Sequence, residues 1–395
     1  TAVLSKINEI ANHNSLWETD RVFHMLVVKA LRSWVPPMGL TLTSLAAGYA
    51  ISMNMVCATL SSSNGPCIKE GCLFLRDVCA IADNDNDINQ VPGKQEIRNN
   101  AVVSIVNSLT SNAAVLSPFF NSELDGGDSD VAYEICNALV SLAVNEAELL
   151  SNINSCPVEF FQLLLSCSNQ RPRKVAGLTF DVWIALQDIP VVERHPYVSQ
   201  DVFNTLLSNL LLQCEYPSDY DSNTGWDNCD DDEDEFEEFR DQKYGIQDVI
   251  VVCCYAIQGD SFYEILQKGF AESTEVSVDN GEIRVTNWRR LESTLYVFYH
   301  AMEAVKSSAN SEKCFTALQL LHSVANLVLS AEVQEQCRQH NELQNTVCLF
   351  LGSLTFALTS AGKKDMDPSR PGYAQKMQIS KLFLSSLNFL FVCLP

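Results

Sequence analysis

Apolar residues recur at helical spacing along most of the chain, and this periodicity constrains the fold more than any other feature. The clearest case is residues 288–306, where the intervals are three and four: Trp288, Leu291, Leu295, Phe298, Met302 and Val305. That spacing places them on one face of an amphipathic helix. The 395 residues include only 16 glycines and 13 prolines, too few for the many turns of a β-protein. The sequence therefore predicts helices joined by short loops.

Helical segments are expected near residues 15–33, 42–60, 66–82, 94–110, 130–145, 153–168, 172–187, 198–214, 235–257, 260–269, 287–307, 311–330, 332–360 and 373–393. Helix-ending residues such as Pro36-Pro37 and Asn64-Gly65-Pro66 separate them. Several breaks lie about 20 residues apart, and helix pairs that repeat at about 40 residues are typical of HEAT or armadillo solenoids. We therefore expect an all-α fold, a HEAT-repeat (armadillo-like) right-handed α-α superhelix that forms one solenoid over residues 1–395.

Three segments need a separate interpretation. Residues 276–285 alternate apolar and polar around Asn280-Gly281, which predicts an inserted hairpin or loop at 271–286. Residues 249–255 are rich in β-branched side chains, but we interpret them as a buried helix because they continue the amphipathic pattern that starts at Phe236. Residues 40–60 carry no charge, yet their polar side chains and the lack of basic flanks favour a buried helix over a membrane span.

Charge is distributed unevenly. The chain has 49 acidic and 26 basic side chains and a net charge of -23, and residues 215–241 alone carry 13 acids and one base. This balance disfavours nucleic acid and anionic membrane surfaces as main partners. A basic protein partner is the natural expectation, with the acidic loop 215–235 as its contact.

The candidate contact residues are the acids within this segment: Asp230, Asp231, Asp232, Glu233, Asp234, Glu235, Glu237 and Glu238. Adjacent like charges repel, so we expect a solvated start and a helix only near Phe236, where acids complement the positive helix N-terminus. Nearby Tyr216, Tyr220 and Trp226 are expected to stack on a partner's arginine. The alternative is a solvated loop that only keeps the protein soluble.

Catalytic motifs are missing from the sequence. None of the six histidines has a metal-binding spacing, and no glycine-rich phosphate loop or nucleophile elbow occurs. The 15 cysteines include no Cys-x-x-Cys pair and often sit in apolar surroundings, as reduced, buried thiols of an intracellular protein do. Cys67, Cys72 and Cys79 are expected on or beside one helix as core thiols. The sequence predicts neither an enzyme nor a cofactor, and an α-helical enzyme is the weakest alternative.

Four short motifs follow one another across residues 30–307: Leu31-Arg32-Ser33-Trp34-Val35, Thr179-Phe180-x-x-Trp183-x-x-Leu186, Phe236-Glu237-Glu238-Phe239-Arg240 and Trp288-x-x-x-Glu292-x-x-Leu295. In order and approximate spacing they resemble the importin-beta (karyopherin) superfamily, in the branch of transportin-SR and importin thirteen. The hairpin segment departs from that pattern. Both ends of the sequence look like cuts within a longer protein, so we expect an internal fragment.

The resemblance implies a HEAT-repeat receptor that carries basic or Arg/Ser-rich cargo through nuclear pores. Such a receptor shuttles between cytoplasm and nucleus and binds phenylalanine-glycine nucleoporins and the GTP form of the GTPase Ran. The main Ran surface is expected before Thr1 and the cargo-reading arginine-rich helix beyond Pro395. By position, the resemblance also implies that the acids from Asp230 to Glu238 contact Ran or cargo. A HEAT or armadillo scaffold of another assembly and a nuclear exporter stay open as alternatives.

Overall fold

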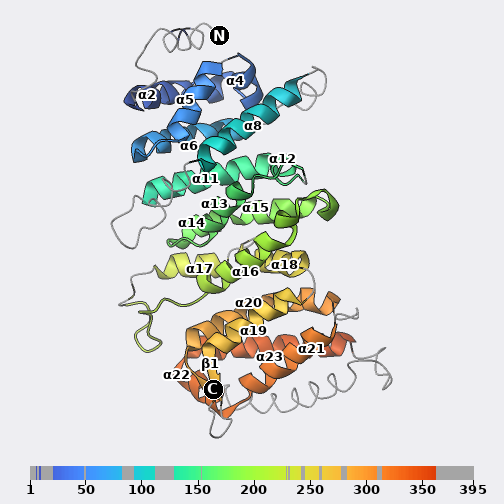
Figure 1. The fold of residues 1–395 in the computed structure, drawn as a ribbon. Coiled ribbons are helices and arrows are strands. Elements are labelled where there is room, and N and C mark those ends of the chain that lie inside the picture. The colour runs from blue at the N-terminus through green and yellow to red at the C-terminus, as the bar shows by residue number, and fades with distance from the viewer. Residues whose placement is uncertain are drawn as a thin grey trace. The chain divides into compact units, whose positions relative to one another are not determined.

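The computed structural model describes residues 21–48, 50–81, 93–111, 129–152, 154–227, 229, 232–241, 245–257, 260–276, 283–308 and 314–361, together with Lys6 and Glu9. It divides into two compact units, residues 1–198 and 199–395. Both are built from packed helices, shown in sequence colours in Figure 1. The predicted all-α class is thereby confirmed.

In the described part of the first unit, the regular elements are helices and short turns. They are α2 (Arg21–Arg32), α3 (Val35–Met38), α4 (Leu42–Gly48), α5 (Ala50–Leu60), α6 (Gly65–Cys79), α8 (Lys94–Thr110), α11 (Ser129–Asn145), α12 (Ala147–Leu150), α13 (Val158–Ser168), α14 (Arg173–Leu178), α15 (Phe180–Ala185), η2 (Leu186–Asp188) and η3 (Val191–Glu193). Successive helices pack in layers, with α6 between α2 and α11 (Figure 1). Each layer buries its apolar face against its neighbours, as solenoid repeats do.

The start and the packing of α6 follow from its local sequence. The Asn64 side chain caps the helix by accepting a hydrogen bond of 3.1 Å from the Cys67 backbone N–H, and a proline occupies the first turn. Gly71 then allows a close approach to α5, since a Cβ there would lie 2.6 Å from Thr59 Oγ1. The Asn-Gly-Pro segment separates two helices, as the sequence predicts, and it also forms the start of α6.

The Thr-Phe-x-x-Trp-x-x-Leu motif of the first unit is a packing motif. Trp183 is fully buried on α15 and donates a 3.0 Å hydrogen bond from Nε1 to Thr179 Oγ1. Phe180 and Leu186 are also buried, on the same side of this segment. The threonine thus satisfies the indole N–H that burial would otherwise leave unpaired.

The second unit centres on one long helix, α20 (Trp288–Ser308). Around it lie α16 (Val202–Gln213), α17 (Glu233–Asp241), α18 (Ile246–Ala256), α19 (Ser261–Ser273), α21 (Cys314–Val328), α22 (Ala331–Gln339) and α23 (Asn341–Ala361). Helix α20 contacts α16, α18, α19 and α23. Its predicted apolar stripe is buried at Trp288, Leu291, Leu295, Phe298 and Met302; the side chain of Val305 lies outside the described residues.

A two-stranded antiparallel hairpin lies between α19 and α20. Strand β1 (Thr274–Val276) pairs with β2 (Ile283–Val285), with Glu275 opposite Arg284. The tip with Asn280-Gly281 lies outside the described residues. The alternating pattern at 276–285 therefore marks a segment that forms strands.

Several predicted boundaries are wrong. The expected helix at 235–257 is two helices, α17 and α18, and Gly245 flanks the second. The expected helix at 332–360 divides at His340 into α22 and α23, and 172–187 divides into α14, α15 and η2. The predicted buried helix at 249–255 is confirmed as part of α18, whereas the segment at 373–393 lies outside the described residues. The single-solenoid organisation of 1–395 stays a prediction.

Among the described residues, no helix combines the length and the apolar character that crossing a bilayer requires. Residues 42–48 and 50–60 instead form α4 and α5. Leu45, Met55 and Val56 are buried, so the buried interpretation of this uncharged segment is the correct one.

Candidate functional site: the acidic face of α17

Most of the predicted contact residues lie on or next to α17. Asp232 precedes the helix, and Glu233, Asp234, Glu235, Glu237 and Glu238 are part of it. Asp230 and Asp231 lie outside the described residues. Of the described acids, only Glu235 is half-buried, and the others are exposed.

The exposed acids form two rows on the outer face of α17. Glu233, Glu237 and Asp241 are spaced by four residues, as are Asp234 and Glu238, and residues four apart are neighbours on a helix surface. We call Asp232 and these five residues the acidic face. The sequence interpretation missed Asp241, although its spacing from Glu237 was a usable signal.

Helix α17 begins three residues before the predicted start at Phe236. Asp232 Oδ1 accepts a 2.9 Å hydrogen bond from the backbone N–H of Glu235, and three acids occupy the first turn. Both features satisfy or complement the positive helix N-terminus. The expected repulsion between adjacent acids was therefore outweighed by capping and by the helix dipole.

The inner face of α17 is anchored by a buried ion pair. Arg240, with 9% of its side chain exposed, lies 2.7 Å and 3.1 Å from the two carboxylate oxygens of Glu292 on α20, which is 1% exposed. Thr346 of α23 donates a 2.6 Å hydrogen bond to the same carboxylate. Burial alone would lower the pKa of Arg240, but the Glu292 carboxylate raises it above its ordinary value. The arginine therefore stays charged in the core.

This ion pair joins two of the family-like motifs. Phe236 and Phe239 are buried beside Arg240 on the same side of α17, and Trp288 and Leu295 are buried on α20 together with Glu292. The backbone carbonyl of Arg240 also accepts a 2.6 Å hydrogen bond from Tyr296 of α20. The residues of both motifs hold α17 against α20, while the acidic face points outward.

The aromatic residues that precede α17 pack inside the unit. Ring centroids of Tyr216 lie 4.8 Å from those of Tyr220 and Phe236 and 5.8 Å from that of Trp288. The Arg240 guanidinium lies 5.3 Å from the Tyr216 ring centroid. Tyr220 is only 5% exposed, and Tyr216 already has an arginine of this chain near its ring. Stacking of the half-buried Tyr216 and Trp226 on a partner's arginine stays a prediction.

A polar tether ties the segment before α17 to the α22–α23 junction. Glu342 accepts hydrogen bonds from Tyr220 at 2.5 Å and from Ser222 at 2.8 Å. Ser222 Oγ also lies 2.9 Å from His340 Nδ1, and the His340 ring stacks on Trp288 at 4.2 Å. Burial raises the pKa of Tyr220, and the hydrogen bond to Glu342 adds to the shift. This part of the acidic loop is thus a folded segment.

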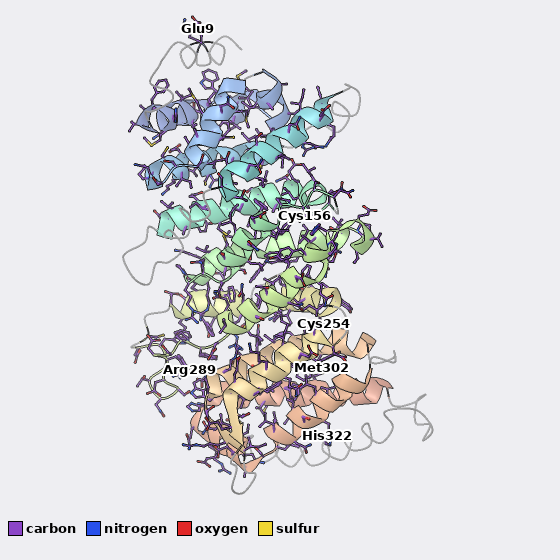
Figure 2. The ribbon with its side chains drawn as sticks, viewed as in Figure 1. Glu9, Cys156, Cys254, Arg289, Met302 and His322 are labelled. Carbon is purple, nitrogen blue, oxygen red and sulfur yellow. The ribbon has the colours of Figure 1, made fainter. Side chains whose placement is uncertain are left out.

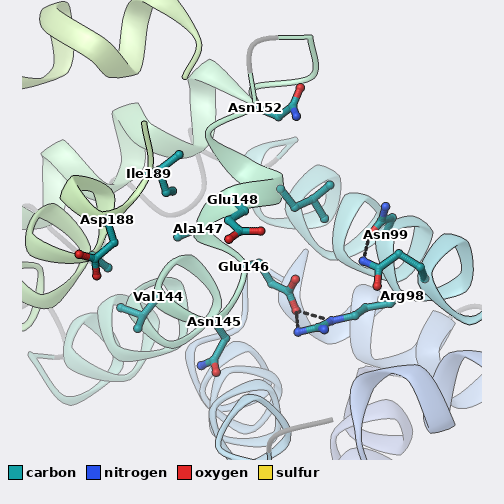
Figure 3. A pocket seen from close by; sticks show the side chains of 13 residues that line it. Arg98, Asn99, Val144, Asn145, Glu146, Ala147, Glu148, Asn152, Asp188 and Ile189 are labelled. Atoms are coloured by element: carbon teal, nitrogen blue, oxygen red, sulfur yellow. Dashed lines mark hydrogen bonds and ion pairs between the residues drawn. The ribbon is translucent and has the colours of Figure 1, made fainter. Parts of the chain in front are cut away.

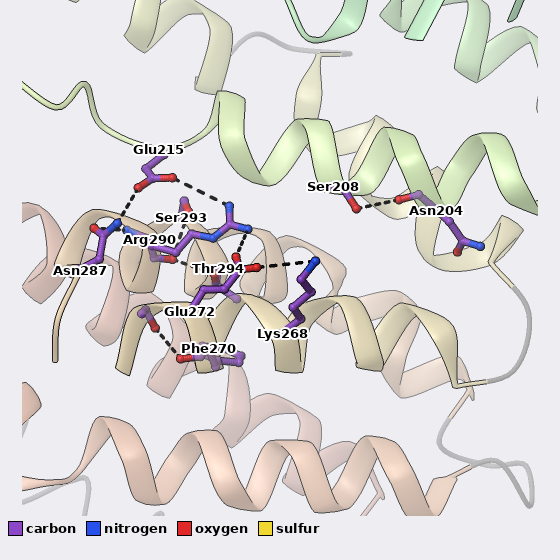
Figure 4. Close-up of polar contacts among 11 residues, drawn as sticks. Asn204, Ser208, Glu215, Lys268, Phe270, Glu272, Asn287, Arg290, Ser293 and Thr294 are labelled. Atoms are coloured by element: carbon purple, nitrogen blue, oxygen red, sulfur yellow. Dashed lines mark hydrogen bonds and ion pairs between the residues drawn. The ribbon is translucent and has the colours of Figure 1, made fainter. Parts of the chain in front are cut away.

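Not every acid of the loop contributes to the exposed charge. Glu215 accepts a 3.1 Å hydrogen bond from the Asn287 side chain and lies 3.9 Å from Arg290 (Figure 4). Arg290 also pairs with Glu272 at 2.8 Å, and Glu272 in turn lies 3.7 Å from Lys268. Glu215 is therefore used within the unit, whereas the acidic face is exposed.

The remaining candidates for chemistry among the described residues are metal-binding groups and cysteine thiols. Within the described part of the chain, no three His, Cys, Asp or Glu side chains are grouped so that they could hold a metal ion. Cys67, Cys72 and Cys79 lie buried on α6 as predicted. Burial raises the pKa of Cys156, before α13, and of Cys254, on α18, to about 12 (Figure 2). Thiols with such pKa values stay protonated at neutral pH and are poor nucleophiles.

Comparison with known proteins places this fold in a known class. No model of a known protein family matches the chain. Over 232 residues the chain is 22% identical to Transportin MOS14 of Arabidopsis thaliana. The aligned region covers 54% of the chain and 21% of that protein. A solved structure of Kap121p bound to Pho4p matches 96% of the chain with 13% identity and a TM-score of 0.52. Importin13 in its cytosolic state matches 96% with 15% identity and a TM-score of 0.52.

These matches confirm the resemblance to the importin-beta superfamily and show the HEAT-repeat solenoid fold of karyopherins. The relatives are named as a transportin, a karyopherin and an importin. The chain spans only 33% of Kap121p and 49% of Importin13. It therefore corresponds in length to a part of these relatives.

Proposed function

We propose that this chain is part of an importin that binds basic or Arg/Ser-rich cargo, phenylalanine-glycine nucleoporins and Ran-GTP, and that shuttles between cytoplasm and nucleus through the pores. The observation that carries the proposal is the sequence match to a transportin, which coincides with a karyopherin fold over nearly the whole chain. Solved structures of Kap121p with Pho4p and with Nup53p show that a protein of this fold binds other proteins. The activity is binding without covalent chemistry.

The acidic face is the proposed contact for Ran or for basic cargo. Each exposed ion pair contributes about 1 kcal/mol or less, but several carboxylates together raise the rate at which a basic partner associates. Because the Arg240–Glu292 pair fixes α17, these carboxylates are held in place before the partner arrives. A fixed surface loses less conformational entropy on binding than a mobile loop.

To test the function, the full-length protein is immobilised and loaded with a basic, nuclear-localised protein as cargo. Adding Ran loaded with GTP should release the cargo, whereas Ran-GDP should not. Tighter cargo binding with Ran-GTP would instead indicate an exporter. If Ran-GTP has no effect and phenylalanine-glycine repeats do not bind, the protein is a scaffold and the proposal is wrong.

The role of the acidic face is tested separately by neutralising it. The variant Glu233→Gln, Asp234→Asn, Glu237→Gln and Glu238→Gln keeps Asp232 as the helix cap. We expect its affinity for the basic partner to fall by three- to thirtyfold at 50 mM salt and by much less at 500 mM, because salt screens exposed charges.

A control variant neutralises three exposed acids on elements of the first unit, Glu159→Gln, Asp181→Asn and Glu193→Gln. It changes net charge by nearly the same amount without touching α17. Equal losses in both variants would show that net charge alone acts. Unchanged affinity of the α17 variant at low salt would leave the acidic face with only a solubilising role.

A further inference from the structure

A polar cleft belongs to the first unit, whereas the acidic face belongs to the second. It has a volume of about 570 Å³ and is lined by the start of α8, the α11–α12 turn with Asn152, and the end of α15 with η2. In Figure 3, Arg98 and Asn99 line one side of the cleft, and Asp188 and Ile189 line the other. None of its lining residues is aromatic, although pockets for small organic molecules are mostly apolar and aromatic.

Two charged residues of the cleft lining pair with each other. Glu146, only 8% exposed, pairs with Arg98 through two contacts of 2.9 Å and 2.8 Å (Figure 3). These charges compensate each other. The charges that a ligand would meet come from other residues.

Glu148 and Asp188 supply those charges. Both line the cleft and are exposed, and neither forms an ion pair with any other described residue. They come from two different elements of the cleft lining, α12 and η2. Two unpaired carboxylates favour a cationic ligand, and they disfavour nucleic acid and other anions.

Four carboxamides line the same cleft, and each keeps part of its hydrogen-bonding capacity. Gln95 Nε2 donates to Asn99 Oδ1, Asn145 Nδ2 donates to the Ser141 carbonyl, and Asn152 Oδ1 accepts from the Asn154 backbone N–H. Among described residues this leaves Nδ2 of Asn99 and Asn152 as donors and Oδ1 of Asn145 as an acceptor. A carboxamide can match both the C=O and the N–H of a peptide backbone.

We propose that this cleft binds an extended basic peptide segment of a partner protein. The carboxamides pair with the peptide backbone, and Glu148 and Asp188 pair with lysine or arginine side chains. The site goes beyond the proposed function because it is separate from α17 and needs neither Ran nor nucleoporins. It gives the chain a second contact for a basic protein, in its other unit.

The test uses the 395-residue chain with the four α17 substitutions, so that the acidic face does not contribute. The probe is a fluorescein-labelled, end-blocked peptide, Gly-Arg-Gly-Lys-Gly-Arg-Gly, followed by fluorescence anisotropy at 50 mM salt. Adding Glu148→Gln and Asp188→Asn should weaken binding about three- to tenfold and reduce its salt dependence. Adding Asn99→Ala and Asn145→Ala instead should weaken binding about three- to tenfold while leaving the salt dependence unchanged.

Two further peptides separate the contributions. A peptide with glutamine in place of its basic residues should bind equally well with and without the Glu148 and Asp188 substitutions. A peptide with N-methylated backbone amides should bind equally well with and without the Asn99 and Asn145 substitutions. All substituted residues are exposed or half-buried, and equal circular dichroism melting curves would confirm intact folding. The inference is overturned if the peptide does not bind saturably up to 1 mM, or if both cleft variants bind like the background chain. The Ran release assay is independent of either result.

Discussion

The buried Arg240–Glu292 pair provides the strongest test of how α17 is held. Replacing Glu292 with Gln removes the charge that compensates Arg240, while the side-chain volume stays nearly the same. Both side chains are at most 9% exposed, so the guanidinium is left charged in the core. Removing one partner of a buried pair costs about 3–5 kcal/mol. We expect the free energy of opening around α20 to fall by that amount.

Native-state hydrogen exchange of α20 amides measures this free energy locally, which suits a chain of two units. The double variant Arg240→Met with Glu292→Leu removes both charges and should recover at least half of the loss, because apolar residues of similar volume often replace buried pairs without cost. Lys268→Ala breaks an exposed contact of 3.7 Å and should change the opening free energy by less than about 0.5 kcal/mol. A loss below about 1 kcal/mol for Glu292→Gln, or no recovery in the double variant, would refute this reasoning.

Two further predictions concern packing and pH. A Cβ at Gly269 would lie 2.7 Å from Thr294 Oγ1. Gly269→Ala should therefore lower the free energy of unfolding, measured in urea, by about 1–3 kcal/mol. Adding Thr294→Ala should restore most of the lost free energy. Gly352, with nothing within 4 Å, is the control, since Gly352→Ala should stabilise α23 by about 0.5–1 kcal/mol. Burial, with a smaller contribution from Arg240, lowers the pKa of His300 from 6.5 to about 4. The folded state therefore binds this proton less readily, so stability should hold above pH 6.5 and fall by up to about 3 kcal/mol towards pH 4. In the His300→Gln variant, the urea midpoint should fall less between pH 6.5 and pH 4, because this histidine no longer contributes. An equal fall in the variant and the unsubstituted chain would contradict the role of His300.

Local periodicity predicted most helices because a buried face leaves a regular pattern of apolar residues in the sequence. The stripe on α20 and the two phenylalanines of α17 are examples. Boundaries were missed within a continuing apolar pattern, at His340, which ends α22, and at Gly245, which precedes α18. The apolar periodicity does not indicate where such a helix begins or ends, because this depends on the backbone geometry of single residues.

Contacts between residues that are far apart in the chain could not be predicted from the sequence. Tyr220 and Glu342 are 122 positions apart, and nothing near either residue indicates their hydrogen bond. The same holds for the cleft, whose carboxamides and carboxylates come from α8, the α11–α12 region with Asn152, and η2. Tyr216, Tyr220 and Trp226 looked like a binding surface because their partners Phe236 and Trp288 were not known to be neighbours.

The acidic face lowers the stability of its own helix. Like charges spaced by four residues destabilise a helix by about 0.2–0.5 kcal/mol per pair, and α17 has three such pairs among Glu233, Asp234, Glu237, Glu238 and Asp241. Capping by Asp232 and the buried Arg240–Glu292 pair offset that loss. A loop that only kept the protein soluble would need neither the helix nor its anchor. A helix that carries this unfavourable charge pattern on a rigid support is consistent with our proposal that the acidic face is a preorganised binding surface.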